Sequence, residues 1–482
     1  MLSVMTSEGG GGRVSGSVGR WDCLASVGLA AVGLVVFAAS LDFRTSGDSL
    51  VYADTIAKAR FDYVAVHFGY YVLIWPVHRL VNLFAPLPVE DVLVYANAVF
   101  GAASLFVGFW LARRVLEGTA AAACAMTVLM FSGRYFANAT SAEMYAPQMF
   151  FLLLSFLLFV HDRPVASGLA AVLSLLITPL SAFCLLVFPV LARLTPSGAV
   201  RRLVICAVSV AIAYGLFLAF MHDALFWGER GLLRIAGSVP YEFAVGGANL
   251  VSNTVKFFLP FLPLAALGLA ALRGRPELLW LLAAAYLPHM YLVFKQPRAD
   301  QLLFPTDFFL ACLCGAGAVA AARVPRVGRY VAVALVGGTV VASVYLLEAF
   351  TGPRNTRYGS DMRALSRHLV DRPGAIVVMS WWDGIALRYY GADPESRDLD
   401  RPGIPVYDAG LLDRVPRPVL PAHSELFVLE SYEPSRVAAL VLGQSRLGRR
   451  YEATSVRRRV ERGLRVRCVP EPAGALELYD CR

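Results

Sequence analysis

The chain has little charge. Only 16% of its 482 residues are Asp, Glu, Lys or Arg, and 57% are hydrophobic, whereas a soluble domain carries about 25% charged residues. Lysine is the scarcest charged residue, present only as Lys58, Lys256 and Lys295. The net charge of +9 does not indicate nucleic-acid binding, because the arginines lie in short loops between apolar segments. We therefore expect an integral membrane protein with no nucleic-acid partner.

About eleven apolar segments are long enough to cross a membrane, which takes about twenty residues and somewhat fewer inside a bundle. They cover residues 24–41, 91–112, 119–137, 144–160, 165–178, 180–194, 202–221, 252–272, 277–294, 303–322 and 329–349. Alternate connecting loops hold basic residues, namely Arg13, Arg20, Arg113, Arg114, Arg163, Arg193, Arg201, Arg202, Arg273, Arg275, Arg323, Arg326 and Arg329. Cytoplasmic loops are enriched in Lys and Arg. We therefore expect a bacterial plasma-membrane protein whose N-terminus is cytoplasmic and whose 42–90 loop and C-terminus are extracytoplasmic.

The segment 165–194 leaves two alternatives. The pair Thr178-Pro179 interrupts it, and proline breaks the hydrogen bonding of a helix. The segment is therefore either two short spans or one re-entrant hairpin that is kinked at this pair. The arginines in later loops favour two spans, because two spans keep the alternation of sides.

Composition divides the chain into three parts. Residues 1–23 are Gly-rich and expected to be disordered in the cytoplasm, residues 24–350 form the membrane domain, and residues 351–482 are rich in Arg, Asp, Glu and Pro. In the last part, hydrophobic patterns predict helices at 362–370, 385–390 and 435–442, strands at 375–380 and 425–430, and a C-terminal hairpin. Its length of about 130 residues suffices for a separate core, so we predict an extracytoplasmic α/β domain.

The eight cysteines differ in their surroundings. Six fall in or beside predicted spans, where a thiol behaves as a small apolar group: Cys23, Cys124, Cys184, Cys206, Cys312 and Cys314. Cys468 and Cys481 flank the turn of the predicted hairpin, so they are candidates for a disulfide in an oxidising compartment. The histidines show no spacing typical of a metal site.

The first outer loop, residues 42–90, is the most informative stretch. It contains Asp48 and Asp54, then His67 and an aromatic run from Phe68 to Trp75. Charges followed by aromatic rings are typical of a segment that lies on the membrane surface. Asp48 is either a general base at the mouth of a membrane cavity or the cap of a surface helix that starts at Ser49.

Two other outer connections carry charged side chains. Arg134, Glu143 and Tyr145 surround the connection at 137–143. They fit substrate binding, or the ordinary roles of a snorkelling arginine, a helix N-terminal acid and an interfacial ring. Lys295 and Arg298 face outward against the positive-inside bias. They indicate either an anionic partner such as a lipid phosphate or ordinary loop solvation.

These residues resemble motifs of the GT-C superfamily, integral membrane glycosyltransferases that include protein O-mannosyltransferases and lipid A aminoarabinose transferases. The resemblance covers most of residues 24–350. It rests on the segments SGDSLVYA with Asp48, HFGYYVLIWP with His67, Ala112-Arg113-Arg114, SAEMYAPQMFFLLLSFLLF and QLLFPTDFFLAC. The chain differs from the family pattern at Ser49, where a second acid is common, at Phe68, where a proline is common, and before Leu303, where an Arg-Tyr pair is missing.

The resemblance implies a GT-C-like fold and a polyprenyl-phosphate sugar as donor, with its lipid tail between spans. It implies that Asp48 is the base of an inverting transfer, and that Lys295, Arg298 and Arg134 bind the donor phosphate. The residues implied in substrate binding are Asp54, His67, Tyr70, Glu143 and Tyr145. The partners would be membrane lipids and an extracytoplasmic lipid, glycan or protein acceptor. No cofactor or metal is implied.

The main alternative is a multi-pass transporter or lipid flippase of the cell envelope, and another is a non-catalytic scaffold that recruits partners through residues 351–482. A transporter places polar residues at mid-membrane, commonly in broken helices of repeated halves. We find no internal repeat, and His289 is one of few ionisable residues inside the predicted spans. The spans therefore favour the enzyme.

Overall fold

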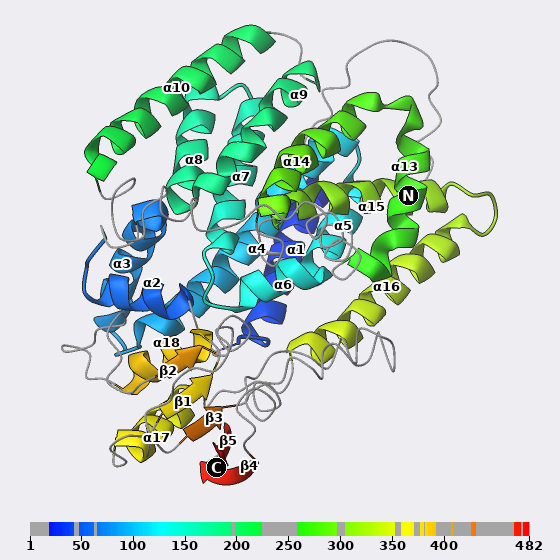
Figure 1. Ribbon diagram of the computed structural model, residues 1–482. Coiled ribbons are helices and arrows are strands. Elements are labelled where there is room, and N and C mark those ends of the chain that lie inside the picture. Colours follow the sequence, from blue (N-terminus) through cyan, green and yellow to red (C-terminus); the bar gives the residue numbers. More distant parts are fainter. Residues whose placement is uncertain are drawn as a thin grey trace.

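The computed structural model describes residues 19–42, 48–61, 65–194, 198–223, 258–295, 304–351, 358–370, 376–379, 381–391, 406–408, 426–429, 467–473 and 476–481. Figure 1 shows a helical bundle above and a smaller unit of helices and strands below. Helices α2 (Asp48–Ala57) and α3 (Phe68–Asn82) lie between the two at one side. The predicted interfacial loop therefore contains helices, as its pattern indicated.

Four described helical segments are long and apolar enough to cross a membrane: α1 (Arg20–Ala38), α4 (Val89–Leu116), α10 (Ala199–Phe220) and Phe304–Ala322, which contains α15 (Asp307–Ala322). The bent pair of α5 (Thr119–Phe131) and α6 (Gly133–Thr140) makes a fifth if it is one span. Further helices of the bundle are α7 (Tyr145–Val160), α8 (Pro164–Ile177), α9 (Val187–Leu194), α13 (Leu262–Ala271), α14 (Pro276–Lys295) and α16 (Gly328–Thr351). The chain is thus a polytopic helical membrane protein, and the number of about eleven spans stays a prediction.

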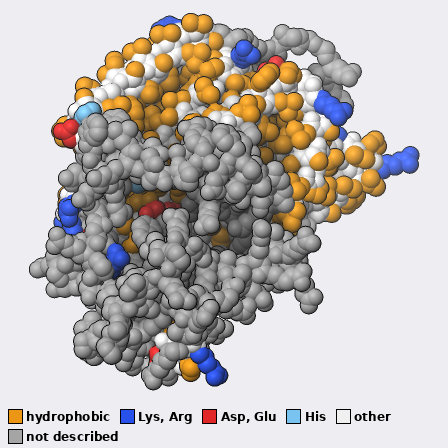
Figure 2. Space-filling view, viewed as in Figure 1, with side chains coloured by type: hydrophobic (Ala, Val, Ile, Leu, Met, Phe, Trp, Pro, Cys, Tyr) orange, Lys and Arg blue, Asp and Glu red, His pale blue; other side chains and the backbone are white. Residues whose placement is uncertain are grey.

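The surface of the bundle is apolar. On α10, Val204, Ile212, Leu216 and Phe220 are each more than half exposed. Figure 2 shows hydrophobic side chains over most of the visible bundle, with basic side chains at its margins. An apolar surface this extensive is not found on monomeric soluble proteins, and it fits a surrounding of lipid tails.

Glycines set the closest helix contact of the bundle. A Cβ added to Gly268 of α13 would lie 2.0 Å from the carbonyl oxygen of Leu313, and one added to Gly317 of α15 would lie 1.9 Å from that of Leu264. Helices in lipid associate through such close backbone packing, because burying apolar surface gives no net gain there. This contact fixes α15, whose first turn reaches the site described below.

The predicted span 119–137 is not one straight helix. α5 ends at Phe131, and α6 leaves it at an angle of 65°. Ser132 between them is extended (φ −71°, ψ 134°) and buried, and its hydroxyl donates to the carbonyl of Leu129 at 3.0 Å. The bend turns the polar residues of α6 into the protein, whereas the sequence analysis placed them at the outer end of a span.

The break predicted at Thr178-Pro179 is observed. α8 ends at Ile177, Thr178 is extended, and a 3-10 helix, η2 (Pro179–Leu186), leads into α9. The Thr178 hydroxyl accepts a hydrogen bond from the backbone N–H of Leu180 at 3.4 Å. Both halves are shorter than an ordinary span, so the choice between two spans and a re-entrant hairpin stays open.

A buried acid ties together the N-terminal helices. The Asp22 carboxylate of α1 lies 2.7 Å from the guanidinium of Arg113 in α4 and also accepts a hydrogen bond from the hydroxyl of Thr119 in α5. Asp22 is 3% exposed. A buried carboxylate of this kind depends on its partners, so these contacts lock three helices at one end of the bundle.

We expect Asp22→Ala to destabilise the protein by about 2 kcal/mol, the typical contribution of a hydrogen bond to a charged group. The measurement is thermal unfolding in detergent. Asp162→Asn is the control, because the Asp162 carboxylate is 76% exposed and 3.9 Å from Arg202, and asparagine tolerates the left-handed backbone at this position (φ 59°). Equal unfolding temperatures for the two variants would contradict the assignment.

Residues after α16 contain α17 (Tyr358–Val370), α18 (Trp381–Gly391) and a five-stranded sheet of order β2-β1-β3-β5-β4. β1 (Ile376–Met379) runs parallel to β2 (Val406–Asp408) and β3 (Leu426–Leu429), and β5 (Leu476–Cys481) runs antiparallel to β3 and β4 (Cys468–Ala473). α17, α18, β1, β3 and the β4–β5 hairpin match the predicted elements within a few residues, whereas β2 was not predicted. The helix predicted at 435–442 lies outside the described residues.

The hairpin brings the predicted cysteine pair into register. Cys468 and Cys481 are Cα partners in the β4–β5 ladder. Cys481 is disulfide-bonded, and the six other cysteines of the chain are free. Directly opposite positions on antiparallel strands place two Cβ atoms close together, which is the arrangement that a cross-strand disulfide needs.

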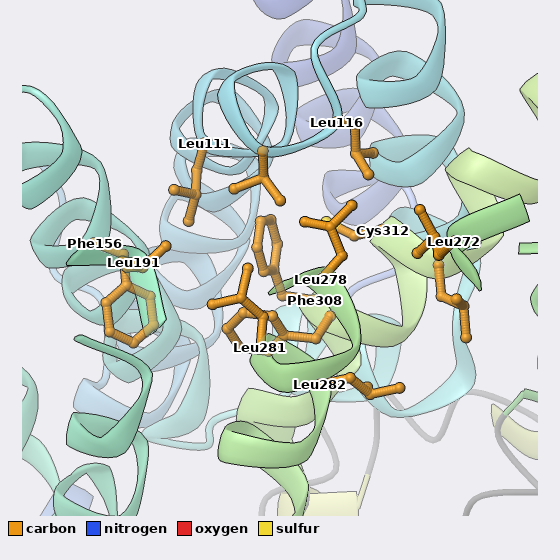
Figure 3. A pocket seen from close by; sticks show the side chains of 13 residues that line it. Leu111, Leu116, Phe156, Leu191, Leu272, Leu278, Leu281, Leu282, Phe308 and Cys312 are labelled. Atoms are coloured by element: carbon orange, nitrogen blue, oxygen red, sulfur yellow. The ribbon is translucent and has the colours of Figure 1, made fainter. Parts of the chain in front are cut away.

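An apolar pocket lies between α4, α7, α9, α14 and α15 (Figure 3). Leu111, Phe156, Leu191, Leu281 and Phe308 point into it, and Cys312 is its one titratable lining residue. It adjoins the Arg113 end of α4. Without polar groups to orient a reacting molecule, this pocket is not a catalytic site.

Candidate active site

The first turn of α2 carries the acid that the sequence analysis singled out. α2 begins at Asp48 itself, one residue before the predicted start. A negative charge is favoured there by the partial positive charge of the helix N-terminus. Tyr52 follows four residues later, so both side chains lie on one face of α2.

Glu143 approaches this face from the turn between α6 and α7. The Ser49 hydroxyl donates to a carboxylate oxygen of Glu143 at 3.2 Å, across 94 residues of sequence. The side-chain amide of Asn97 in α4 donates to the backbone carbonyls of Ser141, at 2.7 Å, and of Glu143. Asn97 thus fixes the turn, and the turn holds Glu143 against α2.

The surroundings of Glu143 favour its protonated form. Burial and then the negative charge of Asp48 raise the pKa of Glu143 to about 8, while the hydrogen bond from Ser49 acts in the opposite direction. Part of the Glu143 surface is accessible, but protein atoms crowd its carboxyl group. Because two neighbouring carboxylates do not both ionise readily, Glu143 holds the proton.

Tyrosines surround the acids. The ring of Tyr52 meets that of Tyr70 edge-on, with centroids 5.6 Å apart. Burial, and then the charges of Asp48 and Glu143, raise the pKa of Tyr52 well above 10.0. The hydroxyl groups therefore stay neutral and can donate hydrogen bonds. We call Asp48, Ser49, Tyr52, Tyr70, Glu143 and Tyr145 the acid–tyrosine cluster.

His67 packs beside the cluster. Its ring contacts that of Tyr52 edge-on at 5.4 Å, and its Nδ1 lies 3.0 Å from the carbonyl oxygen of Ile177. Burial lowers the pKa of His67 to about 4, against a smaller opposing effect of that hydrogen bond. The imidazole is therefore neutral, donates from Nδ1 to Ile177, and has an acceptor at Nε2.

The other predicted residues have different surroundings. Asp54 pairs with Lys58 one helical turn later, at 2.9 Å. Arg134 is 2% exposed and lies 3.0 Å from Asp307, and its contact with the donor phosphate stays a prediction. Lys295 is the last residue of α14, with a side chain outside the described part, and Arg298 lies outside it altogether.

Sequence reasoning missed four participants. Ser49 and Tyr52 stand in the Asp48 motif, and helical spacing from Asp48 would have identified Tyr52. Asn97 and Asp307 are isolated polar residues of apolar segments, both fully buried. A polar residue inside a span is itself a sign of function, so Asn97 and Asp307 could have been identified from the sequence.

The unit below the bundle contacts the cluster's supporting helices. The hydroxyl of Tyr389 in α18 donates to the carboxylate of Glu90 in α4 at 2.9 Å, and Tyr389 is 4% exposed. α18 also packs against α2, and Figure 1 shows α18 directly below α2 and α3. The helix that carries Asp48 thus lies between the bundle and α18.

We expect Tyr389→Phe to accelerate hydrogen exchange in both α18 and α2, because it removes a hydrogen bond to a charged group worth about 2 kcal/mol. Exchange measured by mass spectrometry checks this. Tyr390→Phe is the control, since the Tyr390 ring lies under Arg363 and leaves the Glu90 contact intact. Unchanged exchange in Tyr389→Phe would refute the docking role.

The described residues contain no group of three or more His, Cys, Asp or Glu side chains arranged to hold a metal ion. Whether the reaction needs a metal therefore stays a prediction. The chemical groups of the described site are the protonated carboxyl group of Glu143, the carboxyl group of Asp48, neutral tyrosine hydroxyls and a neutral imidazole.

Solved structures share this fold. The crystal structure of ArnT, an aminoarabinose transferase, from Cupriavidus metallidurans bound to undecaprenyl phosphate matches with a TM-score of 0.53 and 15% identity, over 94% of this chain and 97% of that chain. Its apo form matches with a TM-score of 0.51 and 16% identity, over 86% and 94%. An oligosaccharyltransferase from Archaeoglobus fulgidus gives 0.47 and 14%, over 76% and 61%. No family model and no curated protein matches the sequence. The chain therefore has the overall fold of the two ArnT structures, as expected from its sequence.

Proposed function

We propose that this chain is a membrane glycosyltransferase that moves a sugar from a polyprenyl-phosphate donor to an extracytoplasmic lipid, glycan or protein acceptor. The observation that carries the proposal is the acid–tyrosine cluster, which lies between the bundle and the lower unit of a chain with the fold of ArnT. The orientation with the cluster outside and the N-terminus inside is part of the proposal and rests on the arginine pattern.

Asp48 is the proposed base. Its carboxylate takes the proton of the acceptor hydroxyl or amine as the acceptor attacks the anomeric carbon of the sugar. The bond between that carbon and the phosphate oxygen breaks, and polyprenyl phosphate leaves with the bonding electrons, with inversion at carbon. Glu143, which holds a proton at neutral pH, leaves Asp48 as the basic member of the pair.

Lys295 and Arg298 are the proposed cations for the leaving phosphate, because fixed positive charge stabilises developing negative charge. Arg298 is six residues before Phe304, so the chain keeps the two within about 20 Å. The Phe304 ring contacts that of Tyr145 in the cluster, with centroids 6.2 Å apart. The chain is thus short enough for Arg298 to reach a site at the cluster.

The test is transfer by purified protein in liposomes supplied with polyprenyl-phosphate sugars and an extract of envelope acceptors. We expect release of polyprenyl phosphate together with a glycosylated product. Movement of the lipid between leaflets with no transfer from any donor would instead support the flippase alternative and refute this proposal.

A further inference from the structure

The interior of the bundle contains an ion pair that the proposed chemistry does not use. A guanidinium nitrogen of Arg134 lies 3.0 Å from a carboxylate oxygen of Asp307, across 173 residues of sequence. The two side chains are 2% and 0% exposed. Removing two charges from water costs several kcal/mol for each ion, which their attraction seldom exceeds by much. Folding stability alone therefore explains such a pair poorly, and charges inside a membrane domain commonly mark function.

Ring contacts connect the surroundings of the pair to the acid–tyrosine cluster. Tyr135, next to Arg134, stacks on Phe304 with centroids 5.7 Å apart and planes at 11°. Phe304, three residues before Asp307, also contacts the ring of Tyr145. Asp307 is therefore connected to the cluster through Phe304, whose ring contacts that of Tyr145.

Arg134 is connected to Glu143 through α6, the helix that contains Arg134. This helix has eight residues, too few to be stable without tertiary contacts. Its described anchors include the ion pair of Arg134 and the Tyr135 hydroxyl, which donates to the carbonyl of Gly101 at 2.6 Å. The Thr140 carbonyl also accepts a hydrogen bond from the backbone N–H of Asp42 at 2.8 Å. α6 ends at Thr140, directly before the turn that holds Glu143. Asn97 holds the turn from the side of α4, and Arg134 contributes by fixing the helix that leads into it.

We propose that Arg134 and Asp307 are positioning residues, whose ion pair fixes α6 and the first turn of α15 so that Glu143 faces Asp48. The proposal rests on the transfer function proposed above. Neither side chain touches the reacting atoms; both act through the turn at 141–144 and through Phe304.

The experiment separates positioning from stability with a neutral pair. Arg134→Gln and Asp307→Asn are made singly and together, and kcat, donor KM and unfolding temperature are measured. Each single variant removes one side of the ion pair while the opposite charge stays buried, and it is expected to unfold at lower temperature. The double variant removes both charges and is expected to regain most of the stability. The control is Arg202→Gln with Asp162→Asn, a looser pair at 3.9 Å.

In the double variant, kcat is expected to stay about 10- to 100-fold low, because small displacements of reacting groups cost this much, while donor KM changes less than about threefold. Arg134→Lys keeps the positive charge, and its kcat is expected to lie between that of Arg134→Gln and that of the wild type. The control pair is expected to leave kcat unchanged. Recovery of kcat together with stability in the double variant would overturn the proposal.

A second readout does not depend on activity. Hydrogen exchange at residues 141–144 is expected to be faster in the double variant than in the wild type, because the turn has lost an anchor. If wild-type protein transfers no sugar from any polyprenyl-phosphate donor, the proposed function fails, and the exchange result still decides the positioning role. Unchanged exchange overturns that role in either case.

Discussion

Asp48→Asn is expected to lower kcat for sugar transfer by at least about 100-fold, the lower end of the range for a general base. Asparagine keeps the shape of the aspartate side chain and can occupy the first position of α2, so folding is expected to persist. It accepts no proton from the acceptor. The measurement is kcat at saturating donor and acceptor, with the unfolding temperature as a check on folding.

Substitutions of two other acids serve as comparisons for Asp48→Asn. Asp223 lies beyond the end of α10 and its side chain is 99% exposed, so Asp223→Asn is expected to have wild-type kcat. Asp54 shares α2 with Asp48, but its carboxylate already pairs with Lys58. Asp54→Asn is therefore expected to change KM more than kcat. Full activity in Asp48→Asn would remove Asp48 from the mechanism.

The helices and the hairpin were predicted from the sequence, because they depend on residues that are close together in it. Long apolar runs became helices with lipid-facing surfaces, because a backbone in lipid must satisfy its own hydrogen bonds. The hairpin at the C-terminus was predicted because alternating segments flank the Pro- and Gly-containing stretch 470–474. The register of Cys468 with Cys481 follows from that short connection.

Tertiary contacts determined what the sequence analysis missed. The bend at Ser132 depends on a hydroxyl that bonds to the Leu129 carbonyl, and a lone serine in an apolar run predicts nothing of the kind. Arg134 was expected at a membrane surface because arginines usually reach water. Its partner Asp307 is 173 residues away, so no local pattern could reveal that the charge is satisfied inside the bundle.

The candidate site was predictable in part for the same reason. Asp48, Tyr70, Glu143 and Tyr145 come from segments that resemble one family's motifs, and the structure brings them together. The relation between the two acids was not predictable, because it depends on burial. Only the fold shows that Ser49 bonds to Glu143 and that Asn97 fixes the turn between α6 and α7.

Glu143→Gln tests how the two acids divide their roles, and its largest expected effect is on the pH dependence of kcat. Since the pKa of Glu143 is raised to about 8, the wild type loses the Glu143 proton above that pH. The second negative charge then lies beside Asp48 and repels the donor phosphate. We expect wild-type kcat to fall by about tenfold per pH unit above this pKa.

Glutamine resembles the protonated acid at every pH. Glu143→Gln is therefore expected to keep kcat within about threefold of the wild type at neutral pH and to lack the alkaline decline. Ionisation of the substrates affects both proteins equally, so their ratio isolates Glu143. Asp223→Asn, measured alongside, is expected to retain the decline.

The proton on Glu143 also makes the folding stability of the protein depend on pH. The pKa of Glu143 is about 8 in the folded protein, against an ordinary value of 4.5. Between these values the folded state binds more protons than the unfolded state, so stability falls as pH rises through this window and levels off above it. Glu143→Gln is expected to remove this fall. A variant that folds with this flatter profile but transfers no sugar at any pH would show that Glu143, and not Asp48, is the base.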